Sequence, residues 1–246
     1  MATISSKIHH GVGHLFKQLA VVAALGACGL AQAGVLDFEG PSADTPFIFT
    51  SDINQFGDYW VESWGGTHIG DLVGSVVDGS DNGLCVGIAC PVNNASHYYA
   101  ALDDGYFYFG LNDNSNFTVK SLNASFIGAG QPSFPATSGV LVLQGFNLAD
   151  AAVGSALQIG LSGPTAGSFN FASYDLSATT FGNTPFGYVR VAGYACDASG
   201  NCNRDANLAN YALDNLVTVS VPEPGTWALL GLGLAGLGVF SRRRPA

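Results

Sequence analysis

Apolar and polar residues alternate in short runs through the middle of the chain. Runs rich in β-branched and aromatic residues are separated by Gly, Asn, Asp and Pro roughly every eight to twelve residues. Between the two ends of the chain, no long segment keeps the 3.6-residue apolar period of an amphipathic helix. The pattern predicts strands at residues 35–38, 59–64, 72–77, 98–102, 106–109, 117–127, 140–146, 156–161, 169–174, 186–194 and 211–219. We therefore expect an all-β domain, a two-sheet β-sandwich of the jelly-roll type.

One connection in this pattern carries a strong turn signal. Asp103, Asp104 and Gly105 stand between the strands predicted at 98–102 and 106–109. Asp-Gly pairs favour the left-handed backbone of tight turns between paired strands. We therefore expect a β-hairpin here.

The N-terminal end departs from the strand pattern. Lys7 and Lys17 precede an apolar stretch at residues 19–30, and the chain then reads Ala-Gln-Ala up to Ala33. A positive region, an apolar core and a small-x-small site are typical of a secretory signal peptide. We expect signal peptidase to remove residues 1–33.

The C-terminal end of the chain also departs from the strand pattern. Residues 227–240 form an uncharged apolar stretch, and Arg242, Arg243 and Arg244 follow directly after Ser241. As a helix this stretch is ~21 Å long, which is a marginal span for a hydrocarbon core of ~30 Å. The positive-inside rule keeps the arginines in the cytoplasm and places the preceding chain outside. The alternative is a C-terminal helix that belongs to the core of the domain.

The segment before this stretch contains a short proline motif. Its residues are Pro222, Glu223 and Pro224. The tripeptide, the apolar stretch and the basic cluster occur in this order at the end of the chain, and residues 221–246 resemble the PEP-CTERM sorting signal. That resemblance implies recognition by an exosortase, a membrane-embedded cysteine transpeptidase of Gram-negative bacteria that cuts near the Pro-Glu-Pro. It also implies an inner-membrane intermediate, then the cell surface or extracellular matrix, and an association with exopolysaccharide and biofilm.

The exported domain, residues 34–220, has a large excess of acidic residues. It contains 17 acidic residues and three basic ones, so its net charge is −14. The basic residues are Lys120, Arg190 and Arg204. Nucleic acid and anionic lipid surfaces are poor partners for such a field.

The chain has five cysteines, four of them in the exported domain. Two close pairs in an oxidising compartment predict two small disulfide loops, although other pairings are possible. The pairs are Cys85 with Cys90 and Cys196 with Cys202. A zinc site is the alternative interpretation, but the two cysteines of each pair are more widely spaced than in most zinc sites, and no histidine stands near either pair. The fifth, Cys28, ends a Leu-Gly-Ala-Cys sequence that resembles a lipobox, so a lipidated N-terminus is the alternative to cleavage after Ala33.

The first and last predicted strands of the exported domain share a further resemblance. Residues 36–40 and 211–217 resemble the terminal strands of calcium-containing carbohydrate-binding jelly rolls. That resemblance implies that the two strands lie side by side. It also implies that Glu39 and Asp214 bind one structural Ca²⁺, which prefers hard oxygen ligands. The alternative is an edge glutamate and a turn aspartate without a metal.

Residues with catalytic patterns are scarce in the exported domain. It has no Gly-x-Ser-x-Gly elbow, and its two histidines, His68 and His97, show no metal-ligand spacing. A glycosidase needs two carboxylates beside one sugar bond, and Glu39, Glu62 and many aspartates are available. We expect no enzymatic activity, with a glycan hydrolase as the alternative.

Aromatic residues gather in two places and offer a surface for sugars. One group is Tyr59, Trp60 and Trp64, and the other is Tyr98, Tyr99, Tyr106 and Tyr108. Flat rings with polar edges stack on sugars, but alternate aromatic residues in a strand also form core faces. We expect an exported, non-catalytic protein that binds or embeds in exopolysaccharide. A purely structural or adhesive surface protein is the remaining alternative.

Overall fold

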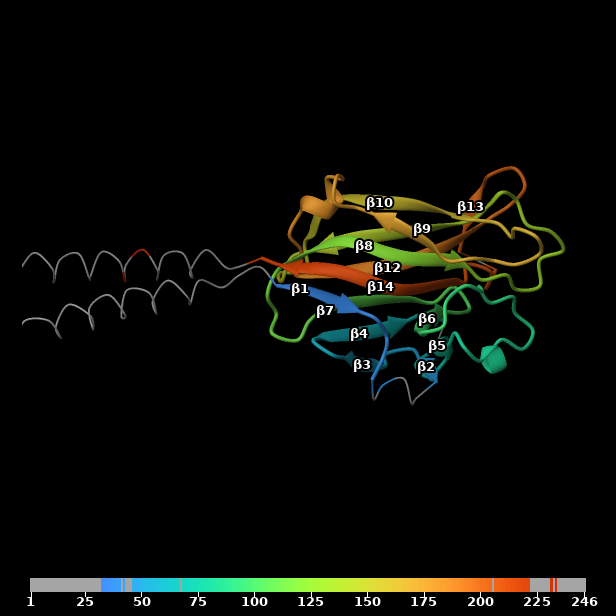
Figure 1. Cartoon of the computed structure of the whole chain (residues 1–246), viewed down its shortest axis with the longest axis horizontal. Coiled ribbons are helices and arrows are strands. Elements are labelled where there is room, and N and C mark those ends of the chain that lie inside the picture. The colour runs from blue at the N-terminus through green and yellow to red at the C-terminus, as the bar shows by residue number, and fades with distance from the viewer. Residues whose placement is uncertain are drawn as a thin grey trace, which may run out of the picture. The chain divides into compact units, whose positions relative to one another are not determined.

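In a computed structural model of the chain, the described residues are 32–40, 42, 46–66, 68–204, 206–221, 231 and 233. The chain divides into two units, one made of residues 1–31 and 222–246 and the other of Gln32–Val221. The strands of the described residues all belong to Gln32–Val221 (Figure 1). Within the described ranges, no helix is both long and apolar enough to cross a membrane. The predicted signal peptide and the stretch at 227–240 lie almost wholly outside these ranges and stay predictions.

Two antiparallel sheets, each with seven strands, make up the described part of this unit. Sheet A contains β1 (Ala33–Leu36), β2 (Phe47–Phe49), β5 (Leu72–Asp78), β6 (His97–Ala101), β8 (Phe117–Phe126), β11 (Ala172–Asp175) and β14 (Tyr211–Ser220). Sheet B contains β3 (Ile53–Phe56), β4 (Tyr59–Trp64), β7 (Tyr106–Leu111), β9 (Thr137–Phe146), β10 (Ala152–Ser162), β12 (Tyr188–Cys196) and β13 (Cys202–Asn203). Two short 3-10 helices, η2 (Asn82–Leu84) and η3 (Phe181–Asn183), lie in loops. The predicted all-β sandwich is confirmed, but the sequence pattern missed the short strands β2, β3 and β13.

The strand order is that of a jelly roll. In sheet A, β14 lies between β6 and β8, and β11 follows β8. In sheet B, β12 lies between β7 and β9, and β10 follows β9. Late strands inserted between early ones in both sheets form the two Greek keys of this architecture. The remaining strands extend the two sheets.

The first and last strands of this unit pair with each other. β1 runs antiparallel to β14, from Ala33 opposite Val219 to Leu36 opposite Leu216. Because β8 occupies the other edge of β14, β1 and β6 share one edge of it. The first and last strands therefore lie side by side, as predicted.

The core lies between the sheets and is rich in aromatic rings. Phe38, Tyr99 and Phe107 are fully buried, with ring centroids 5.6 Å apart for Phe38 and Tyr99 and 4.6 Å apart for Tyr99 and Phe107. Strand β4 alternates between buried and half-buried residues along its whole length. This period of two sends one side of the strand into the core and the other side outward.

The outer face of sheet A is covered by a loop. Tyr98 points away from the main core, and the Phe171 ring packs on it at 5.2 Å. Cys85 and Ile88, from the loop closed by the Cys85–Cys90 disulfide, pack on the same cluster. The second predicted disulfide, Cys196–Cys202, also forms. The sandwich therefore buries a second, smaller apolar cluster under its first disulfide loop.

The turn at Asp103 and Asp104 differs from the prediction in one respect. Both residues have the left-handed backbone expected of a tight turn, and the Gly105 N–H donates to the Leu102 carbonyl at 2.8 Å. The flanking strands do not pair with each other, because β6 belongs to sheet A and β7 to sheet B. The predicted hairpin is wrong. A local turn signal identifies the reversal of the chain but not the partner of each strand.

Candidate functional site: an aromatic face on sheet B

The outer face of sheet B carries half-buried aromatic side chains from four adjacent strands. Val61, Phe107 and Phe109 enter the core, so the residues between them on β4 and β7 point outward. We call this surface the aromatic face. Its members are Trp60, Trp64, Tyr106, Tyr108, Phe146 and Tyr188.

Three rings of the aromatic face lie in one row across the strands. Trp60 is opposite Gly110, Gly110 is opposite Tyr188, and Tyr188 is opposite Phe146. The rings of Phe146 and Tyr188 are stacked at 5.0 Å, and Trp60 lies 6.2 Å from Tyr188. A Cβ at Gly110 would be 2.7 Å from the indole of Trp60. The glycine therefore lets the indole lie over β7 and complete the row.

The next row across the same strands is polar. Glu62 is opposite Tyr108, which is opposite Arg190, and Arg190 is opposite Gln144. These side chains provide carboxylate, hydroxyl, guanidinium and amide groups beside the rings. Apolar rings next to a few convergent polar groups are the usual lining of a small-molecule or sugar site.

A hollow of about 380 Å³ lies over the aromatic row and over the Glu62 and Tyr108 end of the polar row, whereas Arg190 and Gln144 do not line it. It is lined by Trp60, Glu62, Tyr108, Asn114, Phe146, Leu148, Asp150, Gly187 and Tyr188. The Tyr188 hydroxyl donates to Asp150 Oδ1 at 3.0 Å. Burial, together with Asp150, raises the pKa of Tyr188 to about 12, so this hydroxyl stays protonated at neutral pH. The hollow is thus an open site lined by two carboxylates and four aromatic rings.

The predicted group of Tyr59, Trp60 and Trp64 is divided by the sheet. Tyr59 is 2 % exposed and faces the core, whereas Trp60 and Trp64 belong to the aromatic face. Tyr59 is therefore not available to a ligand on this surface, because neighbouring residues of a strand point to opposite sides.

The second predicted group is divided in the same way. Tyr98 and Tyr99 are fully buried, while Tyr106 and Tyr108 belong to the aromatic face. No motif in the sequence marks Phe146, Tyr188 or Arg190 as site residues. They come from β9 and β12, and only the register of four strands brings them beside Trp60.

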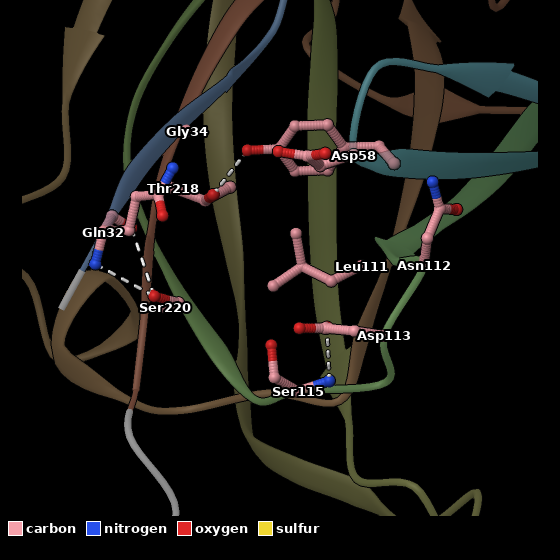
Figure 2. Close-up of a pocket in the computed structure, with 10 residues that line it drawn as sticks. Gln32, Gly34, Asp58, Leu111, Asn112, Asp113, Ser115, Thr218 and Ser220 are labelled. Carbon is pink, nitrogen blue, oxygen red and sulfur yellow. Dashed lines mark hydrogen bonds between the residues drawn. The ribbon is translucent and has the colours of Figure 1, made fainter. Parts of the chain in front are cut away.

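A second hollow, of about 250 Å³, lies beside the ends of β1 and β14 (Figure 2). Its lining is mostly polar: Gln32, Gly34, Asp58, Tyr59, Leu111, Asn112, Asp113, Ser115, Thr218 and Ser220. Tyr59 Oη and Thr218 Oγ1 are hydrogen-bonded there at 2.7 Å. The Ser115 N–H donates to Asp113 Oδ1, and this bond lowers the pKa of the Asp113 carboxyl. With one aromatic residue in its lining, this hollow suits a sugar less well than the aromatic face.

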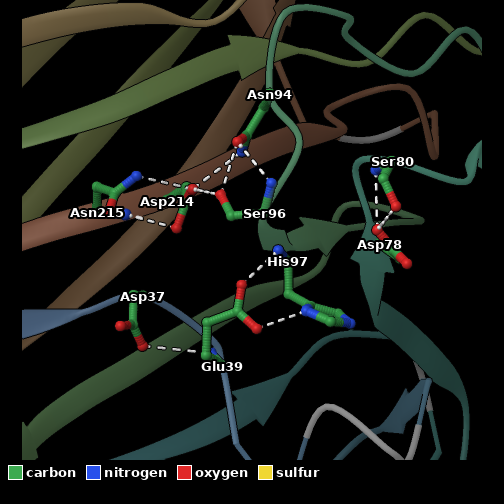
Figure 3. Close-up of polar contacts among 9 residues, drawn as sticks. All are labelled: Asp37, Glu39, Asp78, Ser80, Asn94, Ser96, His97, Asp214 and Asn215. Atoms are coloured by element: carbon green, nitrogen blue, oxygen red, sulfur yellow. Dashed lines mark hydrogen bonds and ion pairs between the residues drawn. The ribbon is translucent and has the colours of Figure 1, made fainter.

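Glu39 and Asp214, the predicted calcium ligands, have separate protein partners (Figure 3). Glu39 accepts hydrogen bonds from the His97 N–H at 2.8 Å and contacts His97 Nδ1 at 2.6 Å. Asp214 is fully buried, and its Oδ2 accepts from Asn94, Ser96 and Asn215 at 2.8–2.9 Å.

The hydrogen bonds of Asp214 and Glu39 can be compared with what calcium coordination requires. Burial raises the pKa of Asp214, and the nearby Asp37 adds to that rise. Three neutral donors already surround one oxygen of Asp214, and both oxygens of Glu39 face His97. The described residues contain no group of three or more His, Cys, Asp or Glu side chains that could hold a metal. These contacts fit a hydrogen-bonding role better than calcium coordination, and the metal site stays a prediction.

The end of the chain matches a known protein-sorting motif. Residues 220–244 match the PEP-CTERM protein-sorting motif. The class of protein is thereby defined as an exported protein that an exosortase processes, with an all-β sandwich before its sorting signal. No curated protein matches the chain significantly.

One of the solved structures that match the chain resembles the fold of the exported domain. A DUF4465 family protein from Bacteroides caccae aligns with a TM-score of 0.52 and 11% identity, covering 77% of this chain and 100% of that one. At this identity the likeness shows the fold alone. The enzymatically active domain of tailspike protein 4 of bacteriophage CBA120 reaches a TM-score of 0.31 at 11% identity, covering 67% of this chain and 20% of that one. A fucose binding module, SpX-3, of Streptococcus pneumoniae reaches 0.25 at 12% identity, covering 51% and 73%.

Proposed function

We propose that the exported domain is a non-catalytic polysaccharide-binding module that holds the protein in the exopolysaccharide of its own cell. The observation that carries this proposal is the row of Trp60, Tyr188 and Phe146, three rings that lie across four adjacent strands of sheet B. Sugar rings present apolar C–H faces that stack on such rings, while their hydroxyls bond to polar neighbours. The polar row beginning at Glu62 supplies those neighbours.

The contrast between the two sheets supports this choice of surface. The outer face of sheet A is covered around Tyr98 by the first disulfide loop and Phe171. The aromatic face has an open hollow of about 380 Å³ over its rings. The sorting motif supports the setting, because an exosortase substrate is exported to the envelope where exopolysaccharide is made.

Affinity electrophoresis of the full-length chain in non-ionic detergent, through gels with and without the exopolysaccharide of the host, tests the proposal. We expect the polymer to retard the wild-type chain. Trp60→Ala should weaken binding by about 1.5 kcal/mol, roughly tenfold, because a ring contact is lost. Phe47→Ala is the matched control, since Phe47 is an exposed aromatic residue on β2 of sheet A. Equal retardation of both variants would place the binding surface elsewhere.

A glycan hydrolase is the second candidate, because Glu62 and Asp150 both line the hollow. Two carboxylates on either side of a sugar bond are the requirement for this reaction. The test is an assay for new reducing ends during long incubation with the same polysaccharide. Activity that disappears in both Glu62→Gln and Asp150→Asn would replace the binding proposal with the hydrolase.

A structural or adhesive role without a glycan is the third candidate. It predicts that cells carrying the protein still adhere after all polysaccharide is stripped from them. Adhesion that is lost with the polysaccharide favours the binding module.

A further inference from the structure

Positive charge in the exported domain is concentrated near the aromatic face. The domain has three basic residues against 17 acidic ones. Lys120 is held at η3, where its Nζ donates to the Gly182 carbonyl at 2.7 Å and to Asn183 Oδ1 at 3.1 Å. The other two basic residues, Arg190 and Arg204, stand beside the aromatic face, so two of three cations lie at one surface of a domain with a net charge of −14.

Arg190 belongs to the polar row itself. Its neighbours Val189 and Val191 are fully buried in the core, so the Arg190 side chain leaves sheet B on the outer side. Its Nε is buried and has no hydrogen-bond partner among the described residues. Glu62 lies two strands away, about 10 Å at the usual strand spacing. In the described part of the chain, no carboxylate forms an ion pair with this guanidinium.

Arg204 adds a second guanidinium at the edge of the same surface. Its Cζ lies 4.9 Å from the Tyr106 ring centroid and 5.8 Å from that of Tyr194, and its Nη2 donates to the Asp104 carbonyl. Burial raises the pKa of Tyr106, and Tyr108 and Glu62 add to the rise, whereas Arg204 and Arg190 act to lower it. Both arginines therefore lie close enough to Tyr106 to act on it, next to the polar row.

We propose that the aromatic face selects polysaccharides that carry carboxylate groups, such as polymers of uronic acids, and that Arg190 binds the carboxylate. This inference rests on the proposed function and specifies its substrate class. A guanidinium forms two parallel hydrogen bonds with a carboxylate, which a hydroxyl of a neutral sugar does not match. Glu62 and Asp150 in the hollow, like the acidic remainder of the domain, repel an anionic polymer, so Arg190 and Arg204 would also fix where its carboxylates lie.

The probes are two acidic polymers and their neutral counterparts. Polygalacturonate and alginate are each compared with the same polymer after its carboxyl groups have been reduced to alcohols. Affinity electrophoresis uses the full-length chain in non-ionic detergent, with a chelator present so that calcium does not gel the polymers. We expect the acidic form of at least one polymer to bind about tenfold more tightly than its reduced form at low salt. Raising the ionic strength should narrow this difference.

Three variants assign the effect to Arg190. Arg190→Gln should lose the preference for the acidic form, and Arg190→Lys should recover only part of it, because an ammonium lacks the planar fork. Lys120→Gln is the control for the loss of one positive charge and should keep the full preference. Thermal melting of each variant shows whether it is folded.

The outcomes separate this inference from the function on which it rests. Retardation by the acidic form that Arg190→Gln abolishes supports carboxylate selection. Equal retardation by acidic and reduced polymers, or an unchanged preference in a folded Arg190→Gln variant, overturns the selection and leaves polysaccharide binding standing. No retardation by any probe, with none by the exopolysaccharide of the host, overturns both.

Discussion

Two neighbouring residues of β4 show how single glycines shape this domain. Trp60 points outward and lies over Gly110, whereas Tyr59 points inward and its hydroxyl lies against Gly34 of β1. A Cβ at Gly110 would overlap the Trp60 indole, and a Cβ at Gly34 would overlap the Tyr59 hydroxyl. The first glycine therefore serves the aromatic face, and the second serves the pairing of β1 with β14.

Gly110→Ala should displace the Trp60 indole without unfolding the domain, because the indole is half-buried and can tilt outward. We expect polysaccharide binding to weaken by about 0.5–1.5 kcal/mol, roughly two- to tenfold, as the ring row is broken. Affinity electrophoresis measures the loss. Gly160→Ala on β10 is the control, since its Cβ would meet only the Thr137 methyl carbon at 3.5 Å. Wild-type affinity in Gly110→Ala would contradict the assigned role of the row.

The elements of the domain differ in what the sequence reveals about them. Runs of β-branched and aromatic residues identified the long strands, because a period of two follows from strand geometry. The same period, read along β4, also places Trp60, Glu62 and Trp64 on one face and Tyr59 on the other, so the division of the predicted group is visible in the sequence. The register between the strands, in contrast, cannot be predicted from the sequence. Trp60 meets Tyr188 only because β7 and β12 align with β4, and such long-range pairing leaves no mark in a single sequence.

The two disulfide loops offer a comparison at the scale of elements. Their sequence separations are 5 and 6, so loop closure should stabilise the fold by a similar amount, about 2 kcal/mol each. The Cys85–Cys90 loop also covers the apolar cluster around Tyr98, whereas Cys202 is exposed. We expect the Cys85→Ala, Cys90→Ala double variant to lose more stability in urea unfolding than Cys196→Ala, Cys202→Ala. Equal losses would show that the first loop contributes only its closure.

At the scale of the whole molecule, the last residues of the unit Gln32–Val221 overlap the start of the sorting motif. The Val221 N–H donates to the Asn116 carbonyl at 2.7 Å, and Pro222 follows directly. The matched motif begins at residue 220, inside the last strand, β14. A cut near the Pro-Glu-Pro would therefore leave every strand of the exported domain in place.

Replacing Pro222, Glu223 and Pro224 with alanine should leave the protein in the inner membrane, because the exosortase then lacks its recognition sequence. Fractionation of cells and immunoblotting of each fraction measure this. Thr226→Ala, which keeps the tripeptide, is the control and should be processed as the wild type is. Normal release of the triple-alanine variant would contradict processing through the sorting signal.

Hydroxyl-radical footprinting of the full-length chain, with and without the exopolysaccharide of its host, tests the central claim most directly. If the aromatic face binds the polymer, oxidation of Trp60, Tyr108 and Tyr188 should fall when the polysaccharide is added. Oxidation of Phe47 and Phe49, exposed on β2, should not change. Protection of the β2 residues, or no protection of the aromatic face at saturating polysaccharide, would contradict the account.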